Sequence, residues 1–255
     1  MVTINLVILG PAGSGKSTLT ANFGKWIQKE LGFKVSYVNL DPGAEYLPYR
    51  PDYDIRSLVT VKEVMKREKL GPNGAIIRCM DIMMENIDKV VKKISGLKSD
   101  YRLIDTPGQM EPFTFRRIGP ELVSKLSDLG SVISLFLVDS VLASSVTGLI
   151  VVELMGLVVQ LRLLAPTLII LNKADLLRVS FDIEKLLTDP EYLTKALNKD
   201  IKEGLINDLM LFLGEAILQY FQASRLIKIS AKKCKGFEAL YDLIHETFCT
   251  CGDLT

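Results

Sequence analysis

A glycine-rich segment near the amino terminus has the residue types that bind a chain of phosphates. Residues 10–17 read Gly-Pro-Ala-Gly-Ser-Gly-Lys-Ser, which matches the spacing G-x-x-x-x-G-K-[ST]. Glycines let the backbone wrap closely, so its N–H groups can point at phosphate oxygens, and a helix that starts near Lys16 adds its positive dipole end. Lys16 can reach the terminal phosphates, and the Ser17 hydroxyl can ligate Mg²⁺. The residues expected to contact the phosphates are Gly10, Ala12, Gly13, Ser14, Gly15, Lys16, Ser17 and Thr18.

A second segment places a carboxylate and a sharp turn where such phosphates would lie. Residues 103–109 read Leu-Ile-Asp-Thr-Pro-Gly-Gln, an apolar run that ends at Asp105. A carboxylate at the carboxyl end of a parallel strand lies beside the phosphate loop, so we expect Asp105 to hold Mg²⁺ through a water. The turn brings the Gly108 N–H near the terminal phosphate, and Gln109 is available to orient a water. The two segments together predict a nucleoside triphosphatase.

Two later segments have the residue types that read a guanine base. Residues 172–175 read Asn-Lys-Ala-Asp after an apolar run. One carboxylate, that of Asp175, can accept both N–H groups of guanine, whereas adenine would leave it unmatched, a difference of about 10⁴-fold or more. Residues 230–232 read Ser-Ala-Lys, a pattern in which a backbone N–H can reach guanine O6. The residues expected at the base are Asn172, Lys173, Asp175, Ser230, Ala231 and Lys232.

Strand-like and helical patterns alternate along the chain and must position these segments. This alternation predicts an α/β fold, a doubly wound and mostly parallel sheet with helices on both faces. We expect one domain over residues 1–255, with a helical insertion at about residues 50–96, where the alternation stops. The expected strands are Asn5–Leu9, Lys34–Leu40, Tyr101–Ile104, Val132–Val138, Thr167–Leu171 and Leu226–Ile229. The expected helices are Lys16–Leu31, Val61–Leu70, Met83–Leu97, Glu121–Leu129, Ser145–Leu164, Ile183–Leu187, Lys195–Tyr220 and Phe237–Cys249.

Composition excludes several classes of protein. The 255 residues carry 31 Lys and Arg against 30 Asp and Glu, a net charge of +1, so binding of nucleic acid through bulk positive charge is not expected. Four cysteines, two of them the pair Cys249 and Cys251, and one histidine form neither a disulfide framework nor a structural zinc site. The amino terminus lacks the basic region of a signal peptide, and we expect a cytoplasmic protein.

The apolar stretch from Val141 to Ala165 is long enough to span a membrane. However, Glu153 stands in its middle, Gly148 and Gly156 interrupt it, and strand-like runs flank it on both sides. We therefore expect a helix buried against the sheet and no membrane association. Its excess of apolar side chains predicts a contact surface for another chain.

The order of these motifs resembles that of a P-loop GTPase over nearly the full length. Gly71-Pro72-Asn73 in the insertion, together with residues 41–45 (Asp-Pro-Gly-Ala-Glu) and 105–111, is similar to the GPN-loop GTPases. That resemblance implies dimers whose subunits face one another across their nucleotides, each GPN loop entering the partner's active site. On this basis Asn73 contacts the terminal phosphate of the partner's nucleotide, and Gly71 and Pro72 fix the shape of the loop. A short chain of this kind looks like the archaeal form, which is expected to be a homodimer.

The resemblance also implies roles in hydrolysis. Asp41 belongs to the first switch segment and could bind a Mg²⁺ water or accept a proton from the attacking water. Asp41, Gln109 and Glu111 remain alternative groups for positioning that water. Ala12 stands where related dimeric ATPases have a lysine that reaches across the interface, which is consistent with the GPN loop supplying that contact.

These expectations lead to a homodimeric, Mg²⁺-dependent GTPase that converts GTP to GDP and phosphate. The alternative is a GTP-gated, chaperone-like binding module with negligible turnover. Family resemblance implies that the protein binds a client protein in RNA-polymerase assembly. We expect Ser145–Leu164 to line either a dimer interface or a nucleotide-gated groove for an apolar segment of a partner. A metal-delivery GTPase is disfavoured by the single histidine. A polynucleotide kinase is disfavoured by the guanine-reading pattern and by the lack of an evident basic, aromatic groove.

Overall fold

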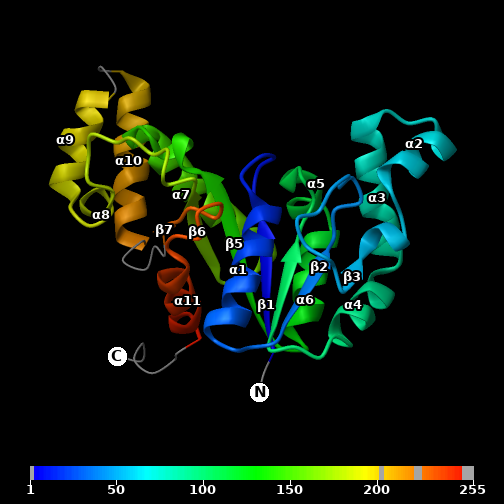
Figure 1. Cartoon of the computed structure of the whole chain (residues 1–255). Coiled ribbons are helices and arrows are strands. Elements are labelled where there is room, and N and C mark those ends of the chain that lie inside the picture. The colour runs from blue at the N-terminus through cyan, green and yellow to red at the C-terminus, as the bar shows by residue number, and fades with distance from the viewer. Residues whose placement is uncertain (1–2, 201–203, 221–225, 249–255) are drawn as a thin grey trace.

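A central parallel sheet organises the chain, as the sequence predicts. The computed structural model describes residues 3–200, 204–220 and 226–248. Its seven strands lie in the order β3-β2-β4-β1-β5-β6-β7, and every paired strand runs parallel to its neighbour (Figure 1). The strands are β1 Ile4–Leu9, β2 Val35–Asn39, β3 Tyr53–Asp54, β4 Tyr101–Asp105, β5 Ser131–Asp139, β6 Thr167–Asn172 and β7 Leu226–Lys228.

Helices cover both faces of the sheet, so the predicted doubly wound α/β fold is confirmed. Side chains alternate across β1: Leu6 and Ile8 pack in one core, and Val7 and Leu9 pack in the other. Helices α1 (Lys16–Glu30) and α11 (Phe237–Glu246) cover the first face. The other described helices are α2 Val61–Glu68, α3 Pro72–Glu85, α4 Ile87–Ser95, α5 Met110–Thr114, α6 Ile118–Ser127, α7 Val146–Leu163, α8 Ile183–Leu186, α9 Pro190–Asp200 and α10 Leu205–Tyr220.

The inserted segment contains one helix more than the sequence pattern predicts. The expected helices leave residues 71–82 outside any helix, but α3 already begins at Pro72. Proline suits the first turn of a helix, since its fixed φ is helical and its missing N–H would have no partner there. The expected helix Met83–Leu97 is wrong as a single element: it is divided at Asn86 between α3 and α4.

Other boundaries also differ from the expected ones. A short edge strand, β3, and the 3-10 helix η1 (Ile55–Ser57) lie between the expected strand Lys34–Leu40 and the expected helix Val61–Leu70, where the sequence pattern predicts no element. The expected helix Lys195–Tyr220 is two helices, α9 and α10. The pair Cys249 and Cys251 lies outside the described residues.

The apolar helix α7 lies against the sheet, as the sequence predicts. By length and composition it is the one helix among the described residues that could span a bilayer, and 44% of it is buried. It contacts β5 and β6 on one side and α9 and α10 on another. Gly156 permits this packing, because a Cβ there would come within 2.4 Å of the Ile169 side chain.

Candidate functional site

The segments singled out in the sequence meet at one edge of the sheet. In parallel strands the carboxyl ends lie together, and loops that follow them form a common crevice. The glycine-rich segment 10–15 follows β1, Asp41 follows β2, and Asp105 ends β4. Asn172 ends β6, and Ser230 follows β7. The fold therefore brings the predicted phosphate and base residues to the same edge (Figure 1).

The glycines of residues 10–15 are required by close packing and backbone conformation. Gly10 has φ +148°, and a Cβ there would lie 2.0 Å from the carbonyl oxygen of Leu137. Gly15 has φ +99°, and a Cβ would lie 2.4 Å from Nδ2 of Asn172. The loop therefore packs closely against β5 and Asn172, and a side chain larger than that of glycine does not fit at these two positions.

Lys16 lies at the centre of the phosphate loop and is buried. Its Nζ donates hydrogen bonds to the carbonyl oxygens of Gly10 (2.7 Å), Pro11 (3.0 Å) and Gly108 (3.0 Å). Burial lowers the pKa of the ammonium, while Asp105, Asp41 and Glu111 oppose that change. The lysine thus bridges the phosphate loop and the Pro107-Gly108 turn, the two segments expected to enclose the terminal phosphate.

Asp105 is almost fully buried and only partly hydrogen-bonded. Its Oδ2 accepts a 2.8 Å hydrogen bond from the hydroxyl of Tyr49, whereas Oδ1 has no hydrogen-bond partner within the described part of the chain. Burial raises the pKa of Asp105 to about 6, against the favourable influence of Ser17, Tyr49 and Lys16. A buried carboxylate oxygen of this kind, with the Ser17 hydroxyl close by, suits a cation or a cation-bound water.

Asp41 joins the first switch segment to the turn after β4. Its Oδ2 accepts a 3.0 Å hydrogen bond from the Gly108 N–H, and Oδ1 accepts one of 2.8 Å from the Gly43 N–H. Burial raises the pKa of Asp41, although these two hydrogen bonds and the Lys16 ammonium act in the opposite direction. The side chain is therefore held where the terminal phosphate is expected, beside the N–H predicted to bind it.

The GPN segment is presented at the same edge but does not close the site of its own chain. Gly71, Pro72 and Asn73 are exposed at the start of α3. A cavity of about 210 Å³ lies between the phosphate loop and the switch segments, and from α3 it is lined by Ile76 rather than Asn73. Its lining residues are Ala12, Asp41, Pro42, Gly43, Ile76, Pro107, Gly108 and Gln109.

The predicted base-reading residues are held together by short hydrogen bonds. Asn172 donates from Nδ2 to the Ser14 carbonyl (2.8 Å) and accepts at Oδ1 from the Ala231 N–H (2.9 Å). It therefore ties the phosphate loop to the segment after β7. Asp175 accepts a 2.7 Å hydrogen bond from the Ser230 hydroxyl and pairs with Lys233 at 2.9 Å.

Lys173 also occupies a fixed position within this segment. It has φ 61°, in the left-handed region that few residues with a side chain adopt. Its Nζ pairs with Asp139 at 2.6 Å, and its carbonyl accepts a hydrogen bond from Ser140. This arrangement links the base-reading loop to the end of β5.

The remaining predicted residues are less constrained by contacts within the chain. Gln109, Glu111 and Lys232 are exposed, and Thr18 is half-buried in α1. Sequence reasoning missed Tyr49, the hydroxyl partner of Asp105, and Lys233, the ion-pair partner of Asp175. Tyr49 lies in a loop with no spacing signal, whereas Lys233 directly follows the Ser-Ala-Lys pattern and could have been noticed as a second cation.

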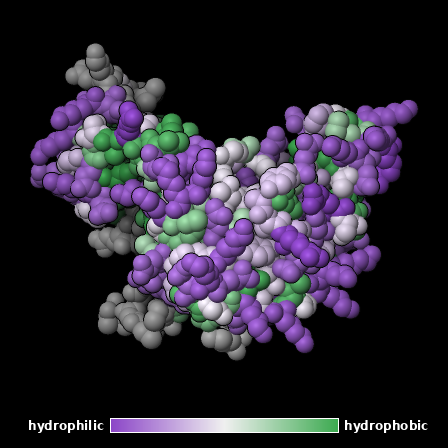
Figure 2. All heavy atoms as spheres, viewed as in Figure 1, coloured by the Kyte–Doolittle hydropathy of each residue, from purple (hydrophilic) through white to green (hydrophobic). Residues whose placement is uncertain are grey.

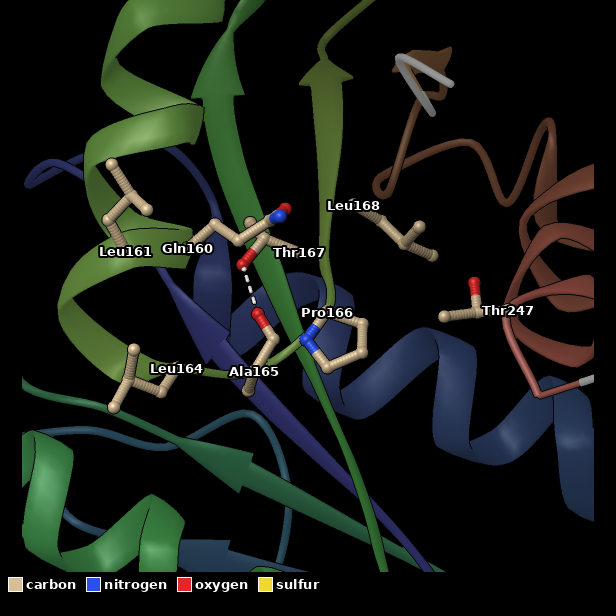
Figure 3. Close-up of a pocket in the computed structure, with 8 residues that line it drawn as sticks. All are labelled: Gln160, Leu161, Leu164, Ala165, Pro166, Thr167, Leu168 and Thr247. Atoms are coloured by element: carbon tan, nitrogen blue, oxygen red, sulfur yellow. Dashed lines mark hydrogen bonds between the residues drawn. The ribbon is translucent and has the colours of Figure 1, made fainter. Parts of the chain in front are cut away.

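A separate cavity lies at the opposite edge of the sheet. This groove of about 540 Å³ lies where α7 ends and β6 begins, as Figure 3 shows. Leu161 and Leu164 approach it from α7, and Thr247 approaches it from the end of α11. Because the motif residues follow the carboxyl ends of the strands, this groove is remote from the nucleotide-binding edge.

Comparisons with known proteins show which family the chain belongs to. A family model described as a conserved hypothetical ATP binding protein matches residues 8–250. The chain is 41% identical to GPN-loop GTPase PAB0955 of Pyrococcus abyssi, over 98% of this chain and 99% of that protein. It is 40% identical to GPN-loop GTPase 3 of Dictyostelium discoideum, over 71% of this chain and 65% of that protein.

The fold agrees with a solved relative as well. The crystal structure of PAB0955 in its apo form matches with a TM-score of 0.84 and 37% identity, over 97% of this chain and 98% of that one. The family description mentions ATP, whereas these relatives are named GTPases, and the Asn-Lys-Ala-Asp segment agrees with the latter. The predicted resemblance is confirmed: the chain belongs to the GPN-loop GTPase family and is a GTP hydrolase.

Proposed function

We propose that the chain hydrolyses GTP with Mg²⁺ as a homodimer, each subunit completing the active site of the other. The observation that carries this proposal is the meeting of Lys16, Asp41 and Asp105 with an exposed GPN segment at one edge of the sheet. Phosphoryl transfer of this kind depends on positioning and on electrostatic stabilisation rather than on a covalent intermediate.

The residues present fit a magnesium ion. Mg²⁺ in nucleotide sites takes few protein ligands and keeps phosphate oxygens and waters. Ser17 offers a hydroxyl, and Asp105 offers a buried carboxylate oxygen without a hydrogen-bond partner in the described chain. Asp41, beside the Gly108 turn, can hold a water of the ion. When bound, Mg²⁺ neutralises charge on the β- and γ-phosphates.

Each group of the chain then has a defined task. Lys16 stabilises charge on the terminal phosphates, for which its Nζ exchanges carbonyl partners for phosphate oxygens. The Gly108 N–H can bind the γ-phosphate once it gives up its hydrogen bond to Oδ2 of Asp41. Asp41, Gln109 and Glu111 are the available groups for orienting the attacking water, and the exposed positions of the last two leave them free to move toward it.

The placement of the GPN segment supports the proposed dimer. Figure 1 shows α2 and α3 extending beyond the carboxyl edge of the sheet, on the same side as the phosphate loop. The exposed Asn73 amide can donate and accept hydrogen bonds but cannot neutralise charge. We therefore assign it a positioning role on the terminal phosphate of the partner's nucleotide, with Gly71 and Pro72 shaping the approach.

Hydrolysis measurements test this function. Steady-state turnover of GTP and of ATP with Mg²⁺ is compared for wild type and Asn73→Ala, alongside mass by light scattering. We expect GTP to be preferred, the wild type to be dimeric, and the variant to remain dimeric with at least tenfold slower turnover. An unchanged rate in Asn73→Ala would contradict the role of the GPN segment, and equal use of ATP would contradict guanine reading by Asp175.

We also propose that the apolar helix α7 helps to bind an apolar segment of a client protein, and that this binding depends on GTP. The proposal is in line with the assembly role that the family resemblance implies. Its inner side packs against Leu186, Leu193 and Leu218 around a cavity of only about 10 Å³, which Glu153 also lines. The segment that leads into α7 is linked to the predicted base-reading loop, since Asp139 pairs with Lys173 and also accepts a hydrogen bond from the Val141 N–H. Nucleotide binding can thereby bias how α7 and its neighbours pack.

Exposed apolar side chains support a contact surface on this part of the molecule. Figure 2 shows a mostly hydrophilic face with apolar side chains gathered over α10 and its neighbours. Phe212 of α10 is 69% exposed, and Leu164 at the far end of α7 is 85% exposed. Binding of an apolar client peptide should be lost in Phe212→Asp, on the helix packed against α7, and retained in Leu129→Asp, whose exposed side chain follows α6. Equal binding by both variants, with GTP and without it, would contradict this proposal.

A further inference from the structure

Lys233 lies directly against the carboxylate that is proposed to read guanine. Its Nζ is 2.9 Å from Oδ2 of Asp175, while the Ser230 hydroxyl donates to Oδ1 at 2.7 Å. Neither partner belongs to the phosphate loop. Lys233 directly follows the Ser-Ala-Lys pattern. Its side chain reaches Asp175 of the Asn-Lys-Ala-Asp segment.

The backbone around Lys233 is fixed by its own hydrogen bonds. Ser230 and Lys235 exchange two backbone hydrogen bonds, of 3.1 and 3.2 Å, which close the loop between them. Within it the Lys233 N–H donates to the Ser230 carbonyl at 3.2 Å and approaches the Ser230 hydroxyl at 3.4 Å. The adjacent Cys234 has φ 51°, a left-handed conformation that turns the chain. The backbone that carries the Lys233 side chain is therefore held in a closed, hydrogen-bonded loop.

The loop is also anchored to the rest of the site. Ala231 is buried, its N–H donates to Oδ1 of Asn172, and its carbonyl accepts a 2.8 Å hydrogen bond from Asn22 of α1. The position of Lys233 relative to Asp175 is thus set by the same contacts that hold the base-reading segment on the phosphate loop.

The hydrogen-bonding capacity of Asp175 matches this arrangement. An ionised carboxylate has about four acceptor positions on its two oxygens. Ser230 takes one on Oδ1 and Lys233 takes one on Oδ2, so the carboxylate keeps acceptor capacity for the guanine edge. The ion pair with Lys233 is also the first cause of a pKa for Asp175 of about 2, so the acceptor stays ionised.

We propose that Lys233 is a positioning residue for guanine recognition: it holds Oδ2 of Asp175 in the orientation that accepts the 2-amino group of the base. This inference rests on the proposed guanine-reading role of Asp175 and extends it to a residue outside the recognised patterns. Because the pair is partly exposed to solvent, its effect is modest compared with that of Asp175 itself.

The test compares GDP with inosine diphosphate, which has the same phosphates and N1–H group but lacks the 2-amino group. Affinities of the full-length protein for both nucleotides and for ADP are measured for wild type, Lys233→Met, Lys233→Arg and Asp175→Ala. Lys235→Met is the matched control, because Lys235 carries the same charge on the same loop and its side chain is exposed. Both nucleotides carry the same phosphates, so a general loss of attraction between lysine and phosphate weakens both equally. It therefore cancels in the ratio of the affinities for GDP and inosine diphosphate.

We expect Lys233→Met to weaken GDP binding and to reduce the preference for GDP over inosine diphosphate, each by about twofold to fivefold. Lys233→Arg should restore the preference, and Lys235→Met should keep it. Equal weakening of both nucleotides in Lys233→Met, or tighter GDP binding, would overturn the inference while Asp175→Ala still loses selectivity over ADP. If Asp175→Ala keeps that selectivity, the guanine-reading function itself fails, and the role of Lys233 fails with it.

Discussion

Replacement of Asp105 by asparagine should stabilise the nucleotide-free protein while it impairs the site. The buried carboxyl has a pKa of about 6, raised from 3.8 by burial. A tenfold change in an ionisation equilibrium corresponds to about 1.4 kcal/mol, so the ionised side chain destabilises the fold by about 3 kcal/mol above pH 6. Asparagine has nearly the same shape and can still accept the hydrogen bond from Tyr49, but it carries no charge.

The sign of the pH dependence follows from proton uptake. Between pH 4 and 6 the folded carboxyl binds a proton that the unfolded chain has released, so wild-type stability falls as pH rises through this range. Asp105→Asn lacks this proton. Its gain in unfolding free energy should be about 3 kcal/mol at pH 7.5 and about 1 kcal/mol at pH 4.5. For chains of this size 3 kcal/mol corresponds to a rise of about 6–12 °C in Tm.

Thermal and urea unfolding of both proteins without nucleotide or Mg²⁺, at pH 7.5 and 4.5, measures this difference. Asp128→Asn is the control, because Asp128 is exposed at the end of α6 and its replacement should leave Tm within about 1 °C at both pH values. A second scan with Mg²⁺ and GDP should show a smaller ligand-induced rise in Tm for Asp105→Asn than for wild type. An Asp105→Asn protein that is no more stable than wild type at pH 7.5, or equally stabilised at pH 4.5, would refute the reasoning.

Three further substitutions test contacts around the site. Tyr49→Phe removes the hydrogen bond to Asp105 and should lower the unfolding free energy by about 0.5–1.5 kcal/mol in urea titrations, and an unchanged midpoint would argue against that contact. Gly10→Ala places a Cβ 2.0 Å from the Leu137 carbonyl and should abolish GDP binding in a fluorescence titration, whereas Gly13→Ala, with no atom within 4 Å of its Cβ, should fold and retain weaker binding. Asn172→Ala breaks both links between the phosphate loop and the segment after β7, and it should weaken GDP at least tenfold by calorimetry; near-normal affinity would show that these hydrogen bonds do not organise the site.

Sequence patterns predict the sheet and its edge well because the physics there is local. Apolar runs such as Val132–Val138 end at polar residues, and parallel pairing then brings those ends together. The insertion was harder to predict. Gly71-Pro72-Asn73-Gly74 has the composition of a turn, yet Pro72 also suits the first position of a helix. The segment is helical from Pro72 because the apolar face of α3 packs on α2 and α6.

Contacts between distant segments could not be predicted from spacing. The hydroxyl of Tyr49 meets Asp105 only because the loop after β2 folds back over the end of β4, a long-range arrangement without a local signature. The partnership of Lys233 with Asp175 likewise depends on the closed loop between Ser230 and Lys235. Motifs identify the groups that can do the chemistry, whereas packing determines which other side chains orient them.

Complementation between two inactive subunits tests the central proposal, a site completed by the partner's GPN segment, most directly. Lys16→Ala lacks the phosphate-binding lysine, and Asn73→Ala lacks the GPN asparagine. In a mixed dimer of the two, one site combines the intact Lys16 of one subunit with the intact Asn73 of the other. Co-expressed at equal levels, the mixture should show about a quarter of wild-type GTP turnover, since half of the dimers are mixed and each has one complete site. Turnover no higher than the mean of the two parent variants, in a mixture shown to contain mixed dimers, would contradict the account.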